Sequence, residues 1–305
     1  MRALYRTKNG TLYLGDSEHL FESTAFHKLR KKCNLIFTSP PFPLNKKKAY
    51  GNLTGEKYIE WLANFGPIFN ELLAPDGSLV VELGNAWIPK SPTTSLLPLE
   101  SLMELKKRGN FHLCQEFIWH NTTRLPSPVQ WVNVERIRVK DAFTRLWWLS
   151  PSPKPKANNK KVLIEYSDAM KKLLKTQRYN SGKRPSQHKI GEKSFLANNG
   201  GAIPSNVLSI PNTTSSDSYL TYCREKGLKY HPARMPPDLA EFFIKFLTEP
   251  NDLVVDPFAG SNVTGYVADI NGRRWRSIEK EPDYAFSSIA RFSKAWFVQK
   301  KPTSN

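Results

Sequence analysis

The stretch that decides the fold is residues 253–262, LVVDPFAGSN, in which an apolar run enters a loop of proline, glycine and small polar residues. A second stretch far upstream, residues 34–42 (NLIFTSPPF), has the same order of residue types. A short apolar run before turn residues predicts a buried strand. In a parallel α/β sheet the loop after such a strand lies at the edge where ligands bind. The two stretches therefore predict ligand-binding loops at the carboxyl ends of strands.

Strands and helices alternate on both sides of these two loops. Apolar runs predict strands at residues 11–14, 34–37, 78–83, 116–119, 145–149, 253–255 and 275–278. Helical spacing predicts helices at residues 17–32, 58–73, 96–108, 237–248, from 263 onward and at 284–295. This alternation predicts an α/β fold with a doubly wound, mostly parallel, Rossmann-like sheet.

Residues 151–230 break the alternation. The segment opens with PSPKPK, continues through clusters of Asn, Gly and Ser, and contains one credible helix at residues 166–176. A disordered linker is one interpretation, but scattered apolar residues that would anchor the segment to a core favour a loop-rich recognition insertion. The chain is therefore divided into residues 1–150, the insertion 151–230, and residues 231–305, where the α/β pattern resumes.

Positive charge is the strongest bulk property of the chain. There are 45 Lys and Arg against 27 Asp and Glu, which gives a net charge of +18 and a pI near 9.7. The insertion alone holds 15 Lys and Arg against 5 Asp and Glu. Binding of a polyanion through its phosphates explains this distribution better than solubility alone. The candidate phosphate contacts are Lys46, Lys47 and Lys48 after the front loop, and Lys183 and Arg184 in the insertion.

The downstream loop has the features of a nucleotide-cofactor site. Gly260 permits close backbone approach, and the helix beyond it offers unpaired N–H groups. Glu279 ends the next predicted strand, 23 positions after Asp256, where a carboxylate can accept hydrogen bonds from ribose hydroxyls. The dinucleotide fingerprint G-x-G-x-x-G is absent, and Asp256 suits a cofactor with an ammonium group better than a pyrophosphate. S-adenosylmethionine has that ammonium group.

The upstream loop, Ser39-Pro40-Pro41-Phe42, suits a substrate with an exocyclic amine. The lone pair of such an amine is delocalised into the ring, so an enzyme must place hydrogen-bond acceptors around its N–H bonds. Prolines carry no backbone N–H, so this loop offers mainly carbonyl oxygens, to which Ser39 adds a hydroxyl. The Phe42 ring offers a face for stacking a base extruded from a duplex.

Taken together, these motifs resemble those of the DNA amino-methyltransferases of bacterial restriction-modification systems, in the β arrangement. In that family the catalytic loop comes first, the target-recognition region second and the cofactor loop last. The resemblance covers residues 11–295 and is weakest in the middle. One departure is Asn262, where the family usually has Gly; because Asn tolerates a left-handed backbone, we expect the turn to persist.

The resemblance implies transfer of a methyl group from S-adenosylmethionine to cytosine N4 in a short site of double-stranded DNA, with the target base flipped out. The serine form of the catalytic motif goes with cytosine, whereas adenine N6 enzymes usually carry Asp or Asn first and Tyr last. The implied catalytic residues are Ser39, Pro40, Pro41 and Phe42. The implied cofactor-binding residues are Asp16, Thr38, His231, Pro232, Asp256, Phe258, Gly260, Ser261 and Glu279.

Several alternatives remain open. An adenine-N6 enzyme of the same family is the nearest; a non-catalytic nucleic-acid-binding protein explains the charge but not the paired loops. RNA or protein-glutamine methylation usually goes with Asn-Pro-Pro-Tyr. Carbon-5 cytosine methylation needs a Pro-Cys pair, and none of Cys33, Cys114 and Cys223 follows a proline, so each is expected to be a buried small hydrophobe. No metal site, membrane segment or secretion signal is expected, which favours the cytoplasm.

Overall fold

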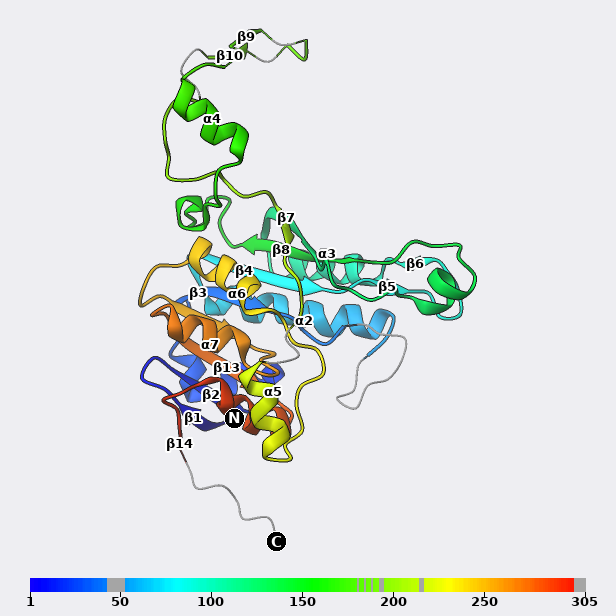
Figure 1. Ribbon diagram of the computed structural model, residues 1–305. Helices are drawn as coiled ribbons and strands as arrows, with labels where there is room; N and C mark the ends of the chain where they lie inside the picture. The colour runs from blue at the N-terminus through cyan, green and yellow to red at the C-terminus, as the bar shows by residue number, and fades with distance from the viewer. Residues whose placement is uncertain are drawn as a thin grey trace. The chain divides into compact units, whose positions relative to one another are not determined.

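The computed structural model describes residues 1–42, 53–179, 181–183, 185–187, 189–191, 195–213 and 217–298 (Figure 1). The chain divides into two compact units: one comprises Met1–Ala157 and Asn206–Asn305, and the other is Asn158–Ser205. The predicted insertion, residues 151–230, therefore contains the whole smaller unit together with segments that belong to the larger one.

The larger unit is built on one sheet in the order β11-β7-β8-β4-β3-β12-β13-β2-β1-β14. Its strands are β1 (Arg2–Arg6), β2 (Gly10–Leu14), β3 (Cys33–Thr38), β4 (Leu73–Leu83), β7 (His112–His120), β8 (Phe143–Ser150), β11 (Val207–Ser209), β12 (Leu253–Asp256), β13 (Arg274–Glu279) and β14 (Trp296–Phe297). A separate hairpin pairs β5 (Ala86–Trp87) with β6 (Thr94–Ser95).

The centre of the sheet is parallel. Strands β4, β3, β12, β13 and β2 run in one direction, whereas β8, β7 and β1 join through antiparallel pairs nearer the edges. From β3 the chain crosses to β4 on one side, and from β12 it crosses to β13 on the other. The order of the strands therefore reverses between β3 and β12, and ligands bind at such a switch point. The predicted doubly wound, mostly parallel sheet is confirmed.

Helices cover both faces of the sheet (Figure 1). They are α1 (Thr24–His27), α2 (Glu56–Leu72), α3 (Leu97–Arg108), α5 (Ser218–Glu225), α6 (Pro237–Leu247), α7 (Val263–Ile270) and α8 (Pro282–Ser287), with the short helices η1 (Ser17–Glu22), η2 (Gln130–Val134) and η4 (Ser288–Arg291). On one face α6 and α7 bury Phe243 and Val267 against Phe37. On the other, α2 and α3 bury side chains such as Phe65 against Ile36.

Alternate residues of β3 therefore enter opposite cores, because successive side chains of a strand point to opposite faces. Both cores are closed by large side chains, and the two neighbouring residues Trp147 and Trp148 of β8 belong one to each. Both are 8% exposed and are therefore core residues.

Several predicted elements have different limits in the structure. The helix expected at residues 17–32 is split into η1 and α1, because Ser23 between them is extended. The closing helix expected to reach residue 295 stops at Ser287 and continues only as η4. The strand expected at residues 78–83 begins earlier, at Leu73, and its register with β3 jumps from Leu73 to Ser78. The strand β11 and the helix α5 were not predicted.

The smaller unit contains η3 (Asn159–Val162), α4 (Asp168–Thr176) and the hairpin of β9 (Gly182–Lys183) with β10 (Lys189–Ile190). Its helix begins where Ser167 Oγ accepts a hydrogen bond from the Met170 N–H at 3.3 Å, a standard N-cap. The helix predicted at residues 166–176 is thus confirmed as α4, which begins two residues later, at Asp168. None of the helices in the described residues is long and apolar enough to span a bilayer.

Candidate active site

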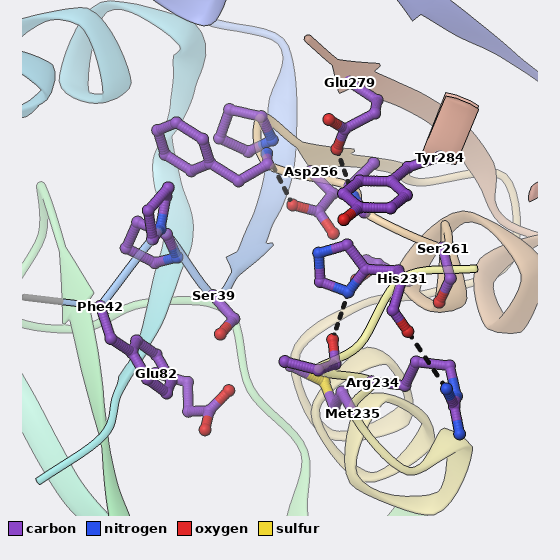
Figure 2. Close-up of a pocket in the computed structure, with 18 of the residues that line it drawn as sticks. Ser39, Phe42, Glu82, His231, Arg234, Met235, Asp256, Ser261, Glu279 and Tyr284 are labelled. Carbon is purple, nitrogen blue, oxygen red and sulfur yellow. Dashed lines mark hydrogen bonds between the residues drawn. The ribbon is translucent and has the colours of Figure 1, made fainter. Parts of the chain in front are cut away.

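A cavity of about 820 Å³ opens at the switch point between β3 and β12. Figure 2 shows Ser39, Phe42 and Glu82 on one side and His231, Asp256, Glu279 and Tyr284 on the other. The two loops predicted from the sequence therefore line the same cavity. We call the first group the substrate side and the second the cofactor side.

Asp256 ends β12 and its carboxylate is fixed by the protein itself. The residue is 5% exposed, and its Oδ1 accepts hydrogen bonds from Thr38 Oγ1 at 2.8 Å and the Phe258 N–H at 3.1 Å. Burial raises the pKa of Asp256 to about 6, although these hydrogen bonds oppose the rise. A carboxylate held away from water in this way is stabilised by a cationic ligand group.

Glu279 ends the neighbouring strand β13, and its two oxygens bind separate backbone groups. Oε2 accepts the Gly260 N–H at 2.7 Å, and Oε1 accepts the Glu281 N–H at 2.8 Å. Burial raises the pKa of Glu279 to about 7, the hydrogen bonds lower it, and the negative charge of Asp256 raises it further. The carboxylate thus shapes the glycine loop while its remaining lone pairs face the cavity.

The glycine loop is shaped for close packing. Gly260 has φ +52°, and a Cβ there would lie 3.2 Å from the His231 ring. His231 donates from Nδ1 to the Ala233 carbonyl at 2.5 Å, and its ring meets that of Tyr284 edge-on at 4.7 Å. Asn262 has φ 56° and ψ 42°, so it adopts the left-handed conformation that its sequence position was expected to tolerate.

A slot beside this loop has an aromatic wall and an acidic end. Phe258 packs against the rings of Trp61 and Phe65, with centroids 5.6 Å and 5.2 Å away. Asp16 caps η1 through the Glu18 N–H at 3.0 Å and pairs with Lys280 Nζ at 2.5 Å. Partial burial opposes ionisation of Asp16, but the bonds from Lys280 and Glu18 hold its pKa below the usual value. An adenine ring has the shape and polarity for such a slot.

The substrate side begins directly after β3. The Tyr58 hydroxyl donates to the Pro41 carbonyl at 2.7 Å. Within the described residues the Pro40 carbonyl has no such donor and stays available as an acceptor. The Phe42 ring lies against Gly84, where a Cβ would come within 2.6 Å of the ring. The loop therefore presents Ser39, one proline carbonyl and one aromatic face, as predicted.

Glu82 is a functional residue that the sequence reading missed. It lies on β4 next to β3, is 4% exposed, and lines the cavity. Burial raises the pKa of its carboxyl group, while the nearby hydroxyl groups of Ser39 and Thr144 and the positive charge of Arg124 act in the opposite direction. Its signal in the sequence was a single charged residue inside the apolar run SLVVELG, because a buried strand rarely carries an unpaired acid.

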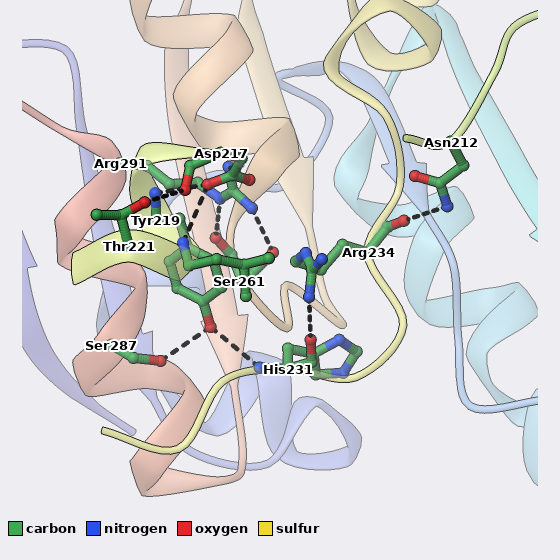
Figure 3. A network of polar contacts seen from close by, with 10 residues as sticks. Asn212, Asp217, Tyr219, Thr221, His231, Arg234, Ser261, Ser287 and Arg291 are labelled. Carbon is green, nitrogen blue, oxygen red and sulfur yellow. Dashed lines mark hydrogen bonds and ion pairs between the residues drawn. The ribbon is translucent and has the colours of Figure 1, made fainter. Parts of the chain in front are cut away.

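A network of polar contacts holds the glycine loop and the His231 segment of the cofactor side in place (Figure 3). Arg291 donates to the Ser261 carbonyl at 2.7 Å, to Ser261 Oγ at 3.1 Å and to Asp217 Oδ2 at 3.2 Å. Asp217 in turn caps α5, whose Tyr219 hydroxyl accepts the His231 N–H at 3.0 Å. Arg291 of η4 thus joins the glycine loop to Asp217 at the start of α5, and the unpredicted helix α5 joins η4 to the His231 segment.

The cavity brings together nearly all residues predicted to form the site. Those that line it are Asp16, Ser39, Pro40, Pro41, Phe42, His231, Pro232, Asp256, Phe258, Gly260, Ser261 and Glu279. Thr38 does not line it: the side chain is 1% exposed and donates to Asp256, so its effect on a ligand is indirect. Its role in cofactor binding stays a prediction, and the structure gives it a supporting position behind Asp256.

Of the predicted phosphate contacts, only Lys183 lies within the described residues. Lys46, Lys47, Lys48 and Arg184 lie outside the described residues, and Lys183 is an exposed residue of β9 in the smaller unit. Cys33 and Cys223 are buried as expected, whereas Cys114 is only half-buried, because β7 has one solvent-facing end. Among the described residues, no three His, Cys, Asp or Glu side chains are grouped as metal ligands.

This fold and site define the class of protein: a Rossmann-like enzyme whose carboxylate-lined cofactor pocket adjoins a Ser-Pro-Pro-Phe loop. A family model described as DNA methylase matches residues 33–290. The chain belongs to this DNA methylase family, which confirms the resemblance seen in its motifs.

Individual relatives agree with the family. The chain is 46% identical over 290 residues to the type II methyltransferase M.PvuII of Proteus hauseri, which covers 94% of this chain and 85% of that protein. It is 26% identical over 287 residues to M.ScaI of Streptomyces caespitosus, covering 94% and 82%. The solved PvuII DNA methyltransferase (cytosine-N4-specific) superposes with a TM-score of 0.74 at 40% identity, covering 94% and 87%.

Proposed function

We propose that this protein is a site-specific DNA methyltransferase that moves a methyl group from S-adenosylmethionine to cytosine N4 in duplex DNA. It would act on host DNA in the cytoplasm as the protective half of a restriction-modification system. The observation that carries the proposal is the position of Ser39 and Phe42 opposite Asp256 and Glu279 in one cavity. The similarity to M.PvuII and to a cytosine-N4-specific structure supports the choice of base.

The cofactor side fits S-adenosylmethionine. The buried Asp256 carboxylate suits the ammonium group, Glu279 suits the ribose hydroxyls, and the slot beside Phe258 suits the adenine. A dinucleotide would bring a pyrophosphate toward Asp256, and two like charges at a buried site are unfavourable. When bound, S-adenosylmethionine supplies an electrophilic methyl group.

The substrate side fits the amine that receives this methyl group. Ser39 Oγ and the Pro40 carbonyl would accept its two N–H bonds, which draws the nitrogen lone pair out of conjugation with the ring. Phe42 would hold the flipped base flat. Methyl transfer leaves the amine with one proton too many, and the Glu82 carboxylate, which lines the same cavity as Ser39, offers that proton a place to go. No cysteine and no covalent bond to the base are needed.

Nucleoside mass spectrometry tests the reaction. DNA from cells that express the protein is digested and compared with DNA from cells that express the Ser39→Ala variant. We expect N4-methylcytosine only with the unaltered protein, and modified-base sequencing then maps the site. Finding N6-methyladenine without N4-methylcytosine would overturn the choice of base, and finding no modified base would overturn the function.

We further propose that the insertion, residues 151–230, reads the DNA sequence. Its support is its charge and the exposed Lys183 on the β9–β10 hairpin of the smaller unit. The logarithm of DNA affinity falls linearly with the logarithm of salt concentration, and each phosphate contact adds roughly 0.9 to the steepness of this slope for duplex DNA. Replacing Lys183 and Arg184 by Gln should flatten that slope and leave cofactor binding intact. An unchanged slope would remove these two residues from the interface.

A further inference from the structure

Two further residues that line the cavity, Asn121 and Arg124, belong to neither of the groups described above. Both lie in the loop that follows β7, and neither was predicted to be functional. The stem of this loop is closed by the Asn121 N–H, which donates to the Ala142 carbonyl at 2.8 Å. The loop therefore starts at a fixed position at the carboxyl end of β7.

The orientation of the Asn121 amide is set by its neighbours. Its Oδ1 accepts the Thr123 N–H at 3.1 Å and the Asn212 N–H at 3.3 Å. Backbone N–H groups can only donate, so the oxygen must occupy that end of the amide and the NH₂ group must occupy the other. Within the described residues this NH₂ group has no acceptor, so Asn121 presents an uncommitted donor on the wall of the cavity.

Arg124 adds a second donor to the lining of the cavity. Its main chain is engaged, since its N–H donates to the Asn121 carbonyl at 3.2 Å and its carbonyl accepts Lys140 Nζ at 3.2 Å. Its guanidinium makes no hydrogen bond in the part of the chain that the structure describes. Arg124 lines the same cavity as Glu82, and its positive charge opposes the rise in the pKa of that carboxyl group.

The catalytic loop offers hydrogen-bond acceptors, whereas Asn121 and Arg124 offer two donors. Ser39 and the Pro40 carbonyl accept hydrogen bonds, so they suit the amine of cytosine and the amine of adenine equally. The bases differ beside the amine: cytosine carries two adjacent acceptors, N3 and O2, whereas adenine carries one acceptor, N1, and then a C–H group. A pair of donors is satisfied by cytosine and leaves one donor unpaired with adenine, which is costly in a buried site.

We propose that Asn121, together with Arg124, reads the N3 and O2 edge of the flipped base and so selects cytosine over adenine. This inference rests on the proposed function and names the residues that determine its base specificity. Asn212 is a positioning residue in this arrangement: its N–H holds Asn121 Oδ1, and its Nδ2 donates to the Arg234 carbonyl at 3.0 Å.

The test compares two duplexes that carry the mapped methylation site, one with cytosine and one with an abasic sugar at the target position. The affinity of each duplex is measured in the presence of S-adenosylhomocysteine for the unaltered protein and for Asn121→Ala. Loss of a hydrogen bond should weaken binding to the cytosine duplex about ten-fold. Binding to the abasic duplex should hardly change, because it has no base edge to read.

A matched control is Asn206→Ala. Asn206 is another asparagine, whose Nδ2 donates to the Glu116 carbonyl at 2.9 Å, but it is exposed and does not line the cavity. Both duplexes should bind this variant as they bind the unaltered protein. A second test variant, Arg124→Gln, keeps the loop's main-chain bonds and should reduce the ratio of cytosine to adenine methylation at the target position.

The outcomes separate the two levels of inference. If the unaltered protein methylates cytosine but Asn121→Ala loses equal affinity for both duplexes, the role of Asn121 is structural and the proposal fails. If Arg124→Gln also methylates cytosine and adenine in the same ratio as the unaltered protein, Arg124 has no role in base selection either. If the unaltered protein methylates no cytosine at all, the proposed function fails first.

Discussion

The two sides of the cavity differ in how far the protein satisfies its own polar groups. On the cofactor side both carboxylates are bound: Asp256 by Thr38 and Phe258, Glu279 by Gly260 and Glu281. Elsewhere in the cavity, the Pro40 carbonyl, the Asn121 NH₂ group and the Arg124 guanidinium have no hydrogen-bond partner among the described residues. The cofactor side is built before the ligand arrives, whereas the substrate side is completed by it.

The difference has a physical reason. A carboxylate buried without partners is very unfavourable, so the acids that wait for a cofactor must be stabilised by internal donors. The groups that line the substrate part of the cavity are hydrated before a base binds, so their lack of a protein partner costs much less. Variants on the cofactor side should therefore affect folding and cofactor affinity, and variants on the substrate side should affect turnover.

The largest expected effect is on stability, from Arg291→Met. The Arg291 side chain is 5% exposed and pairs with Asp217, so its removal leaves a half-buried acid and two groups of Ser261 without their donors. Breaking a buried ion pair of this kind costs about 3 kcal/mol. Urea denaturation measures the change in the free energy of unfolding, and calorimetry should show weaker S-adenosylhomocysteine binding.

Lys245→Met is the matched control for this variant. Lys245 also pairs with an acid, Glu241 at 2.8 Å, but both side chains are exposed on α6. Exposed pairs of this spacing contribute about 0.5 kcal/mol or less. Equal losses of stability in the two variants would show that Arg291 does not brace the cofactor side.

A smaller effect, on turnover alone, is expected from Ser39→Ala. The hydroxyl acts on the amine as its lone pair is drawn out, so its loss should lower kcat by about 100-fold, as for other groups that act mainly in the transition state. Binding of S-adenosylhomocysteine should be unchanged, because Asp256 and Glu279 hold the cofactor. Ser91→Ala, in the exposed β5–β6 hairpin, is the control. An equal loss of cofactor affinity in Ser39→Ala would contradict the assignment of Ser39 to the substrate side alone.

The smallest effect is expected from Glu279→Ala, and it depends on pH. Loss of a charge-assisted hydrogen bond to ribose weakens S-adenosylhomocysteine binding about ten-fold. Burial raises the pKa of Glu279 to about 7, so in the unaltered protein the acid becomes protonated as the pH falls from 8 to 6. Affinity should fall with it, because a protonated carboxyl group accepts hydrogen bonds poorly.

In Glu279→Ala this part of the pH dependence should disappear. A further loss below about pH 6 should persist, because Asp256, whose pKa burial raises to about 6, takes up its proton there. The folding stability of the protein without ligand depends on pH in the opposite direction. Because the two carboxyl pKa values are raised in the folded state, low pH favours folding, and this contribution is lost as the pH rises through 7. An affinity that does not change with pH between 8 and 6 would contradict the assignment of Glu279.

The sequence determined the fold class and both loops of the site. Short apolar runs followed by Pro, Gly and small polar residues leave few conformations open, so LVVDPFAGSN and NLIFTSPPF predicted their strands and turns correctly. The acid Glu279 was also found, because a carboxylate at the end of the next strand has a fixed place in such folds.

Only the tertiary structure decided which other residues join the site. Glu82 reaches the cavity because β4 pairs with β3, and Asn121 and Arg124 reach it because β7 is joined to β4 through β8. Local sequence does not encode such pairings between separate strands. Thr38, which lies one residue before Ser39, was predicted among the cofactor-binding residues. In the structure its side chain faces Asp256 of the adjacent strand and supports that residue. Periodicity gives the face of a strand on which a residue lies, but the neighbour it meets there is set by how the strands are ordered in the sheet.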